Sequence, residues 1–574
     1  MKLEYLLVIE DPHKHMAKVV IKGRRSNDMN QLRFFLPAWC PGSYMIRDYA
    51  RHIVSLQAMQ GNGEVLHCIK ETKSTWVIDW DKSELSNQGL DFELVYQIYC
   101  FQISVRSSYI DVSHAFINGP GTFMGLVDHP VEEPTLEVVF PQLWSKISTS
   151  LEDISPTRDV FLFKADDYDS FIDCPLEIGC HDTDGFMHGG VPFELAFYGR
   201  VLQHKNQLKA DIKRIVEYIS TLWGNIPFDK YCFISHFLRN QFGGLEHGNS
   251  SVLIFDSALL GKRKEYLDYL SLVAHEYFHA WNIKKIRPIE LGPFDYQKEN
   301  YTTLLWLVEG LTTYMDDLIV FRTGIGQLEE YLEIIKNTLK KYDKNAGKRF
   351  QTLEEASFDA WIKLYNIDEN FKNSNVCYYS KGKLVFMALH ILFFEKGVPF
   401  SEFLKALWNL HQGRPSVGIK SEEVFQIVEG LAGVEVCDEF TRMISTTEDI
   451  DFDFLFKKIG INIKRAPGAS VSIGASVHIK DSCRVFVKEV ELDGSAFKAG
   501  LNPGDEIIGV DGVRILAEDL KIFPDCLGVD TRVRFQVSRA GQLMEVDTIT
   551  EAEGLVVQGL EVLDQNLVTN CFMN

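Results

Sequence analysis

One short string in the sequence has residue types and spacing suited to metal-assisted hydrolysis: His275-Glu276-Tyr277-Phe278-His279. It lies in a segment with helical periodicity that begins near Glu265. Residues four apart share one face of a helix, so both imidazoles can bind one cation, typically zinc. Glu276 between them is close enough to take the proton of a water on that cation. The alternative is that the two histidines only cap or pack the helix.

Two histidines leave a catalytic zinc site one protein ligand short, because open sites combine three protein ligands with a water. A metzincin site would need a histidine at position 285, which is Lys285. The remaining common solution is a glutamate on a following helix. Glu309 lies thirty residues beyond His279, has apolar flanks and is followed by Gly310. Since a buried, unpaired carboxylate is costly, we expect Glu309 to be the third ligand, with Glu299 as the next candidate.

Composition and charge exclude several classes of protein. A length of 574 residues predicts about three to four domains. The net charge of -21 makes nucleic acid an improbable partner. We see no signal peptide, and the longest apolar stretch, 384–394, is shorter than the ~20 residues that span a bilayer. The 11 cysteines are scattered without a C-x-x-C pair, which fits reduced thiols. We expect a cytoplasmic protein without nucleic-acid or membrane partners.

The spacing of apolar residues divides the chain into three parts. As far as about Cys180 it alternates with a period of two, as in 91–98, which predicts strands. After about Tyr198 apolar residues recur at three and four positions, which predicts helices, and strand patterns return at 484–490. The helices are expected at 207–223, 263–284, 327–341, 381–396 and 421–432.

These patterns predict a multidomain α+β protein. Residues 464–470 combine turn formers with small residues and are expected to form a linker. We expect an all-β domain at 1–190, a mostly helical catalytic domain at 191–463, a small third domain at 470–556 and a C-terminal tail at 557–574.

The motif His275-Glu276-x-x-His279 followed by Glu309-Gly310 resembles the gluzincin clan of zinc metallopeptidases, and especially its aminopeptidases. The resemblance implies a thermolysin-like catalytic domain and one Zn²⁺ per chain, held by His275, His279 and Glu309, with Glu276 as general base.

Two further segments resemble that clan. Gly243-Gly244-Leu245-Glu246-His247 is similar to its Gly-x-Met-Glu-Asn loop, which implies that Gly243, Gly244 and Glu246 bind the substrate and that Glu246 pairs with its free amino terminus. Tyr379-Ser380-Lys381-Gly382 matches a segment whose tyrosine stabilises the oxyanion, which implies a catalytic Tyr379. The alternatives are a solvated loop carboxylate at Glu246 and an aromatic residue at Tyr379 that only packs.

The domain order and the segment Leu36-Pro37-Ala38-Trp39-Cys40-Pro41-Gly42-Ser43-Tyr44 are similar to the glycyl aminopeptidase family, whose members carry a PDZ domain. Residues 494–512 resemble a PDZ domain, which implies capture of a peptide or its C-terminus, with Ser472 to Ala475 as the carboxylate loop. The alternative is a structural or autoregulatory role for this domain.

The sequence therefore predicts a zinc-dependent aminopeptidase that removes small N-terminal residues, Gly or Ala, from peptides with a free amino terminus, by means of a metal-activated water. The alternatives are a catalytically silent PDZ scaffold and a zinc endopeptidase. Leu245 and His247 depart from the clan's loop, and Thr313 stands where its frequent Glu-x-x-x-Asp pairing has an aspartate. The residue that orients a zinc-bound histidine is therefore unassigned.

Overall fold

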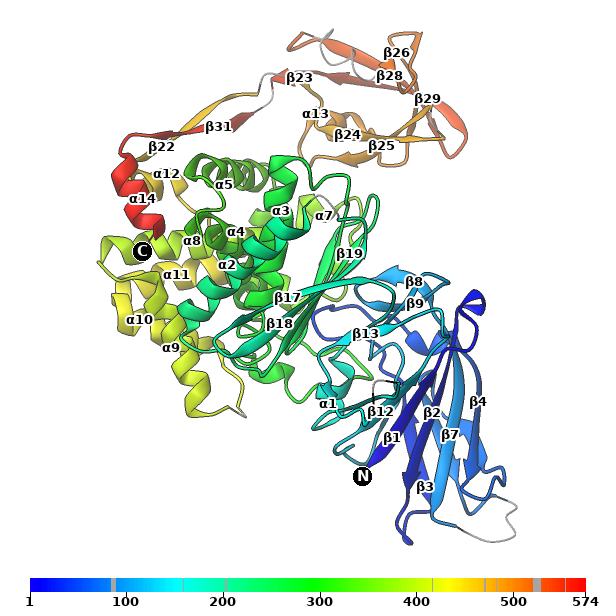
Figure 1. The fold of residues 1–574 in the computed structure, drawn as a ribbon. Coiled ribbons are helices and arrows are strands. Elements are labelled where there is room, and N and C mark those ends of the chain that lie inside the picture. Colours follow the sequence, from blue (N-terminus) through cyan, green and yellow to red (C-terminus); the bar gives the residue numbers. More distant parts are fainter. Residues whose placement is uncertain are drawn as a thin grey trace. The chain divides into compact units, whose positions relative to one another are not determined.

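The structure, a computed structural model, groups the chain into two compact units (Figure 1). The first unit comprises Met1–Tyr301, Met315–Ile325 and Trp408–Ile419, and the second comprises Thr302–Tyr314, Gly326–Leu407 and Lys420–Asn574. The structure describes residues 1–83, 89–157, 159–201, 204–415, 417–468, 471–481, 483–519, 528–552 and 554–573.

The first unit begins with β-strands, as the alternating pattern predicts. Three sheets have the strand orders β14-β15-β12-β1-β2-β7-β4, β13-β16-β10-β9-β8 and β11-β3-β6-β5. The elements are β1 (Leu3–Val8), β2 (Met16–Arg24), β3 (Gln31–Phe35), β4 (Ile53–Gln60), β5 (His67–Lys70), β6 (Thr75–Asp79), β7 (Asp91–Tyr99), β8 (Phe101–Ser104), β9 (Ser107–Ile110), β10 (His114–Ile117), β11 (Gly125–Leu126), β12 (Thr135–Val139), β13 (Lys146–Thr149), β14 (Glu152–Asp153), β15 (Phe161–Lys164), α1 (Tyr168–Ile172) and β16 (Leu176–Gly179).

Strand β7 shows why the alternation predicts this core. Phe92, Leu94, Tyr96 and Ile98 are at most 1% exposed and belong to one apolar cluster, while the residues between them are partly or fully exposed. Because successive side chains of a strand point to opposite faces, one face of β7 lies in the core. The predicted all-β N-terminal domain is confirmed.

A second set of strands and helices in the first unit carries most of the residues singled out for chemistry. The sheet has the order β17-β18-β19-β21-β20, with parallel pairing from β18 to β21 and antiparallel pairing of the edge strand β20. The elements are β17 (Asp182–His188), β18 (Val191–Gly199), α2 (Lys205–Trp223), β19 (Tyr231–Phe237), β20 (Gly243–Glu246), β21 (Ser250–Phe255), α3 (Arg263–Phe278) and α4 (Leu311–Arg322), which passes from one unit to the other. Helix α3 packs against β20 and β21.

A buried carboxylate joins this sheet to the N-terminal strands. Glu177 on β16 accepts hydrogen bonds from His114 Nδ1 and His236 Nε2, each at 2.8 Å, and all three side chains are inaccessible to solvent. Burial alone would raise the pKa of the Glu177 carboxyl, but His236 and His114 lower it to about 2. The ionised Glu177 carboxylate on β16 therefore links β10 and β19 through its two histidine partners.

The second unit is mostly helical. It contains the π-helix η4 (Trp306–Gly310), α5 (Leu328–Asp343), α6 (Leu353–Phe358), α7 (Phe371–Ser374), α8 (Tyr378–Glu395), α9 (Phe400–Gly413), α10 (Ser421–Ala432), α11 (Val434–Ser445) and α12 (Phe452–Lys458). Helix α9 ends in the first unit. Gly310 on η4 and Gly382 on α8 lie so close that a methyl group on Gly310 would come within 2.7 Å of Gly382 Cα. Two glycines are therefore needed where these helices meet.

A small β domain follows in the same unit. It comprises β22 (Ile461–Pro467), β23 (Val471–Ser472), β24 (Ala475–Lys480), β25 (Arg484–Val490), α13 (Ser495–Ala499), β26 (Glu506–Val510), β27 (Val513–Arg514), β28 (Arg532–Arg539), β29 (Gln542–Ile549), β30 (Glu551–Ala552), β31 (Leu555–Val562) and α14 (Gln565–Met573). Its main sheet has the order β24-β25-β26-β28-β29. The predicted sequence of an all-β, a mostly helical and a second β-rich part is confirmed.

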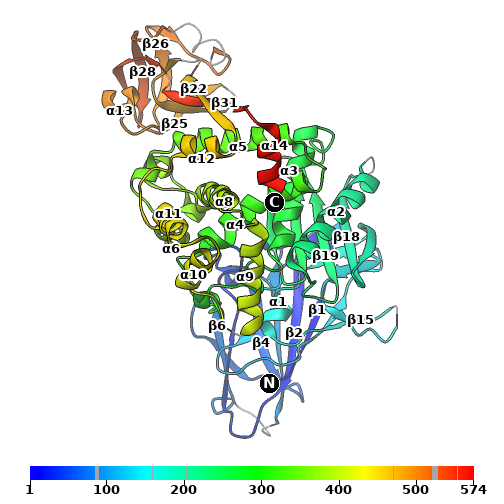
Figure 2. The same cartoon turned by 90° about the vertical axis from the view of Figure 1, so that its left-hand side faces the viewer.

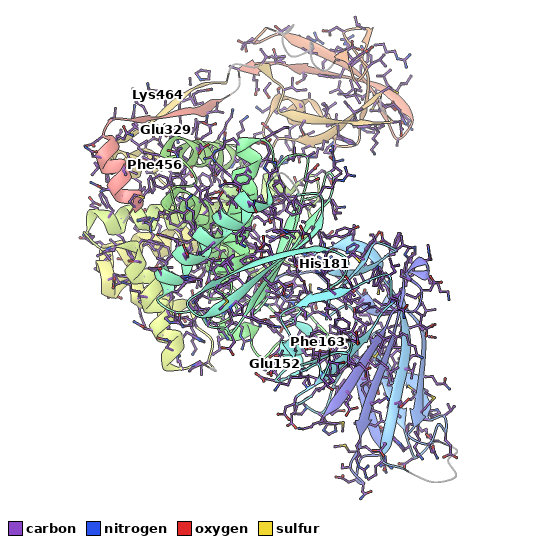
Figure 3. The ribbon with its side chains drawn as sticks, viewed as in Figure 1. Glu152, Phe163, His181, Glu329, Phe456 and Lys464 are labelled. Atoms are coloured by element: carbon purple, nitrogen blue, oxygen red, sulfur yellow. The ribbon has the colours of Figure 1, made fainter. Side chains whose placement is uncertain are left out.

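The start and end of this domain pair with each other. Strands β22 and β31 run antiparallel, with Ile461 opposite Val562, and α14 follows (Figures 1 and 2). Lys464 on β22 lies near α12, which carries Phe456, and β31 packs on α5, which carries Glu329 (Figure 3). The predicted linker at 464–470 is therefore wrong as far as Pro467, because a partner strand nearly a hundred residues away pairs with it; residues 469 and 470 lie outside the described residues. The four-domain division stays a prediction.

In the described parts of the chain, no single helix is long and apolar enough to cross a membrane. Helices α8 and α9 pass that test only together, with a bend of 111° between them. The cytoplasmic location stays a prediction.

Candidate metal centre and substrate cleft

The two histidines of the motif face each other across one turn at the end of α3. His275 Nε2 and His279 Nε2 are 3.1 Å apart. The outer nitrogen of each ring has a fixed partner: His275 Nδ1 donates to Asp316 Oδ2 at 3.0 Å, and His279 Nδ1 donates to the carbonyl of Asn282 at 2.8 Å. A backbone carbonyl can only accept, so the hydrogen bond to Asn282 places a proton on His279 Nδ1.

This arrangement fits a zinc ion. With Nδ1 of each ring turned to an acceptor, the two Nε2 atoms face each other, and a cation between them could accept a lone pair from both. Zinc–nitrogen distances of about 2.05 Å at tetrahedral angles place two ligand nitrogens about 3.3 Å apart, close to the spacing found here. His275 and His279 can therefore hold the metal that the motif predicts.

Asp316 is a residue that the sequence analysis missed. It lies on α4, is 7% exposed and holds the His275 ring. The clan's motif places the carboxylate that orients a zinc-bound histidine four positions after the glutamate ligand, where this chain has Thr313. Asp316 lies seven positions after Glu309, which is two helical turns. A search for a carboxylate at either one or two turns after Glu309 would have found it.

Glu276 lies close to His279 and to Glu246. It is 4% exposed, and ligand-type atoms of Glu276, Glu246 and His279 lie within 4.8 Å of one another. A methyl group on Gly244 would overlap Oε1 of Glu276. Gly244 therefore leaves room for the carboxylate, a role separate from the predicted contact with substrate.

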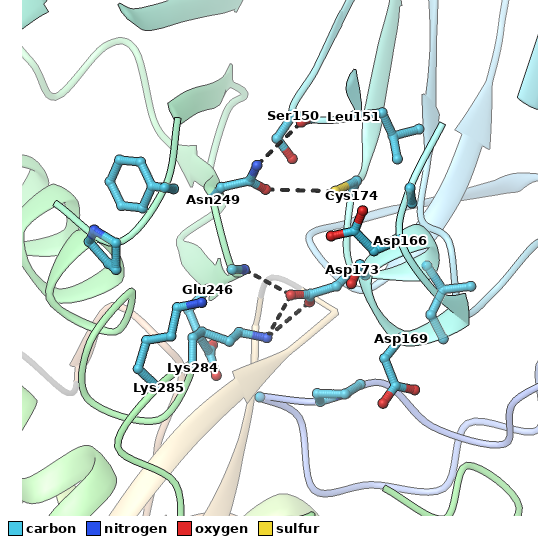
Figure 4. A pocket seen from close by; sticks show the side chains of 18 of the residues that line it. Ser150, Leu151, Asp166, Asp169, Asp173, Cys174, Glu246, Asn249, Lys284 and Lys285 are labelled. Atoms are coloured by element: carbon cyan, nitrogen blue, oxygen red, sulfur yellow. Dashed lines mark hydrogen bonds and ion pairs between the residues drawn. The ribbon is translucent and has the colours of Figure 1, made fainter. Parts of the chain in front are cut away.

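Glu246 ends the edge strand β20 and lines a cavity of about 740 Å³ in the first unit (Figure 4). Its side chain is 4% exposed, and Oε1 has no hydrogen-bond partner among the described residues. A buried carboxylate oxygen without a hydrogen-bond partner has a high desolvation cost, so it attracts a cationic donor. The predicted alternative of a solvated loop carboxylate does not fit this burial.

An ion pair occupies the wall of the cavity beside Glu246. Lys284 Nζ contacts Asp173 at 2.9 Å and 3.2 Å (Figure 4). Asp173 also accepts from His247 Nδ1 at 3.0 Å and from the amide of Gly248. Burial alone would raise the pKa of Asp173, but Lys284 and His247 lower it to about 2. Burial alone would lower the pKa of Lys284, but Asp173 and Glu246 raise it. Lys284 is therefore positively charged and forms an ion pair with Asp173.

The second unit carries the other two predicted residues. Glu309 lies on the π-helix η4 and is 2% exposed; such π-turns are frequent at functional sites. Tyr379 is near the start of α8, with its hydroxyl 3.4 Å from that of Tyr365. Burial, and then the Glu309 carboxylate, raises the pKa of Tyr379 well above its usual value. The phenol therefore keeps its proton and can donate a hydrogen bond.

Family comparisons agree with these motifs. The N-terminal domain model of peptidase family M61 matches residues 4–180, and the model described as M61 glycyl aminopeptidase matches residues 268–385. Together the two models cover just over half of the chain. The chain belongs to the M61 peptidase family. A PDZ domain model matches residues 458–517.

A solved structure agrees with this M61 assignment. An aminopeptidase N family protein from Idiomarina loihiensis is 28% identical, covers 100% of both chains and has a TM-score of 0.92. An M1 zinc metallopeptidase from Deinococcus radiodurans is 12% identical over 78% of this chain and 94% of that one, with a TM-score of 0.49. Yeast LTA4 hydrolase is 12% identical over 79% and 68%, with a TM-score of 0.47. No curated protein sequence matches the chain.

The M61 assignment confirms the predicted family, the PDZ domain and the class of enzyme: the chain is a metallopeptidase. A zinc requirement follows from the family, and His275 and His279 fit it.

Replacing Asp316 with Asn should weaken zinc binding about 10- to 100-fold, because the carboxamide no longer raises the basicity of His275 through its charge. The measurement is zinc affinity by competition with a chromophoric chelator. Asp317→Asn is the matched control, since the neighbouring Asp317 accepts from Ser271 Oγ at 2.8 Å. Equal affinities in the two variants would contradict this role of Asp316.

Proposed function

We propose that the chain is a zinc-dependent aminopeptidase that removes small N-terminal residues, Gly or Ala, from peptides. The observation that carries this proposal is Glu246: its buried Oε1 has no hydrogen-bond partner among the described residues, and a carboxylate oxygen of Glu246 lies within 4.8 Å of ligand-type atoms of His279 and Glu276. A substrate α-ammonium has the opposite charge and supplies the missing donor. An endopeptidase needs no such carboxylate next to its metal ligands.

We propose His275, His279 and Glu309 as the ligands of one zinc ion per chain. Zinc in such a site supplies a Lewis acid for the scissile carbonyl and lowers the pKa of water. The convergence of the two imidazoles supports the histidines. The position of Glu309 supports the third ligand: it is 2% exposed and lies on a π-helix, a kind of turn that is frequent at functional sites.

Side chains of this protein supply proton transfer, oxyanion stabilisation and substrate binding. Glu276 takes the proton of the attacking water and passes it to the leaving amine. Tyr379, whose raised pKa keeps it protonated, donates a hydrogen bond to the carbonyl oxygen as this oxygen becomes negative. Gly243 and Gly244 are on an edge strand that pairs only with β21 among the described strands, so a substrate backbone can align beside them. Glu246 fixes the amino terminus.

The family's description as glycyl aminopeptidases supports the preference for small N-terminal residues. Of the two alternatives, a silent scaffold has no use for the buried Glu246 oxygen, and an endopeptidase would cleave substrates whose amino terminus is blocked.

Two isosteric variants test whether Glu276 acts as the general base and Glu309 as a metal ligand. Glu276→Gln should retain the metal and lose at least ~100-fold in kcat, the range for removal of a general base. Glu309→Gln makes the same chemical change but should deplete the metal, since two imidazoles alone form a weak site. Zinc content after dialysis against a mild chelator is measured beside turnover. Stoichiometric zinc in Glu309→Gln, or near-normal turnover in Glu276→Gln, would overturn the assignment.

Removing Glu246 tests the aminopeptidase function itself. Glu246→Ala should cost about 2 to 4 kcal/mol in kcat/KM for free-amine alanyl or glycyl amides, the scale for truncating one partner of a buried charge pair. Acetylating the substrate should abolish most cleavage by the unaltered enzyme, and the two losses should not add, since both remove one interaction. Equal cleavage of blocked and free substrates by the unaltered enzyme would reject an aminopeptidase.

We also propose that the PDZ domain captures a peptide. Strand β24 is at an edge of its sheet and pairs only with β25 among the described strands, so a peptide can add beside it. A structural role is the alternative: Asn373 on α7 donates to the carbonyl of Val490 at 2.8 Å and accepts from the amide of Leu492 at 2.9 Å. Titration of the whole protein with a labelled peptide carrying a free C-terminus should give saturable binding that amidation of the C-terminus abolishes; no binding would favour the structural role.

A further inference from the structure

Gly42 lies directly against the carboxylate of Glu246, although the two residues are far apart in the sequence. A methyl group on Gly42 would come within 2.5 Å of both Oε1 and Oε2 of Glu246. Real methyl carbons do not approach oxygen so closely, so any larger residue at position 42 must displace the carboxylate. Gly42 also has a φ of +83°, a conformation that favours glycine. The contact and the backbone both require glycine.

The turn that carries Gly42 is fixed relative to strand β20. Ser43 donates its amide hydrogen to the carbonyl of Cys40 at 3.1 Å, which closes the turn. Cys40 is 1% exposed and belongs to the same apolar cluster as Leu245, the residue before Glu246. Because a close-packed cluster resists displacement, the turn and the backbone of strand β20 keep a fixed relative position.

A second set of contacts holds the turn from its other side. Trp39 Nε1 donates to the carbonyl of Asp295 at 2.9 Å, and the amide of Ala38 donates to the carbonyl of Tyr296 at 2.7 Å. Arg47 donates to Ser43 Oγ at 2.7 Å. Gly42 is therefore the tip of a rigid turn that belongs to the N-terminal β domain.

We propose that Gly42 is a specificity-determining residue for the substrate's amino terminus, because it leaves the space in which the Glu246 carboxylate is seated. The inference rests on the proposed aminopeptidase function and assigns part of its recognition to the N-terminal domain. In any substrate the amine nitrogen and the scissile carbonyl carbon are about 2.5 Å apart. A shift of the carboxylate therefore shifts the carbonyl relative to the metal ligands, and a misplacement of about 1 Å costs about 100-fold in rate.

The test is the variant Gly42→Ala, assayed on free-amine and acetylated alanyl amides. We expect kcat/KM for the free-amine substrate to fall about 10- to 100-fold, with a raised KM, while zinc content and the residual cleavage of the acetylated substrate keep their wild-type values. The matched control is Gly63→Ala in the same domain: Gly63 has a φ of +89°, and a methyl group there meets nothing within 4 Å. This control carries the same backbone strain without the contact, and its kcat/KM should stay within about twofold of wild type.

A double-mutant cycle separates the contact from the strain. Glu246→Asp withdraws the carboxylate from Gly42 by one methylene, so Gly42→Ala should cost at least about fivefold less in the Glu246→Asp background than in the wild type. If Gly42→Ala does not fold, Gly42→Ala/Glu246→Ala, which lacks the clash, should fold and bind zinc. Failure of both variants to fold would overturn the proposal, because the effect would then arise in the turn alone.

Two results have distinct meanings. If the unaltered enzyme cleaves blocked and free substrates equally, the aminopeptidase function fails, whatever Gly42 does. If the unaltered enzyme prefers free amines but Gly42→Ala behaves like Gly63→Ala, or costs the same in both backgrounds, the function stands and the role of Gly42 is overturned.

Discussion

The orientation of the His275 and His279 rings is the constraint on which the proposed metal centre depends. Two imidazole nitrogens 3.1 Å apart are spaced to share one cation, so the fold must hold both rings in this orientation. It does so through the outer nitrogens, with the carboxylate of Asp316 for one ring and the carbonyl of Asn282 for the other. Each partner also sets which ring nitrogen is turned toward the other histidine.

Glycines provide the space for the charged groups around this centre. Gly244 leaves room for the carboxylate of Glu276, and Gly42 for that of Glu246. In the second unit, Gly310 and Gly382 let the helix of Glu309 approach that of Tyr379. A glycine in such a sequence motif therefore need not touch substrate. At these positions a neighbour's carboxylate or backbone occupies the space that a side chain would need.

The sequence predicted features whose cause is local. The alternation in β7 and the four-residue spacing on α3 each depend on the geometry of a single element, so the sequence alone predicts both. Three features depend on distant partners and could not: the pairing of β22 with β31, the hydrogen bond from His275 to Asp316, and the contact of Gly42 with Glu246. The segment containing Gly42 was recognised as a family motif, yet only the fold gives it a physical role.

The charges beside Glu246 bear on the role proposed for its buried carboxylate. Lys284 is close enough to interact with Glu246 and would neutralise it if nothing else held the ammonium. Asp173, kept ionised by Lys284 and His247, takes that ammonium in a two-oxygen contact instead. His247, which departs from the asparagine of related loops, thereby has a part in this charge arrangement: its hydrogen bond helps keep Asp173 charged, and Asp173 makes the direct contacts to Lys284. Oε1 of Glu246 is left without a hydrogen-bond partner among the described residues, as the proposed binding of a substrate amine requires.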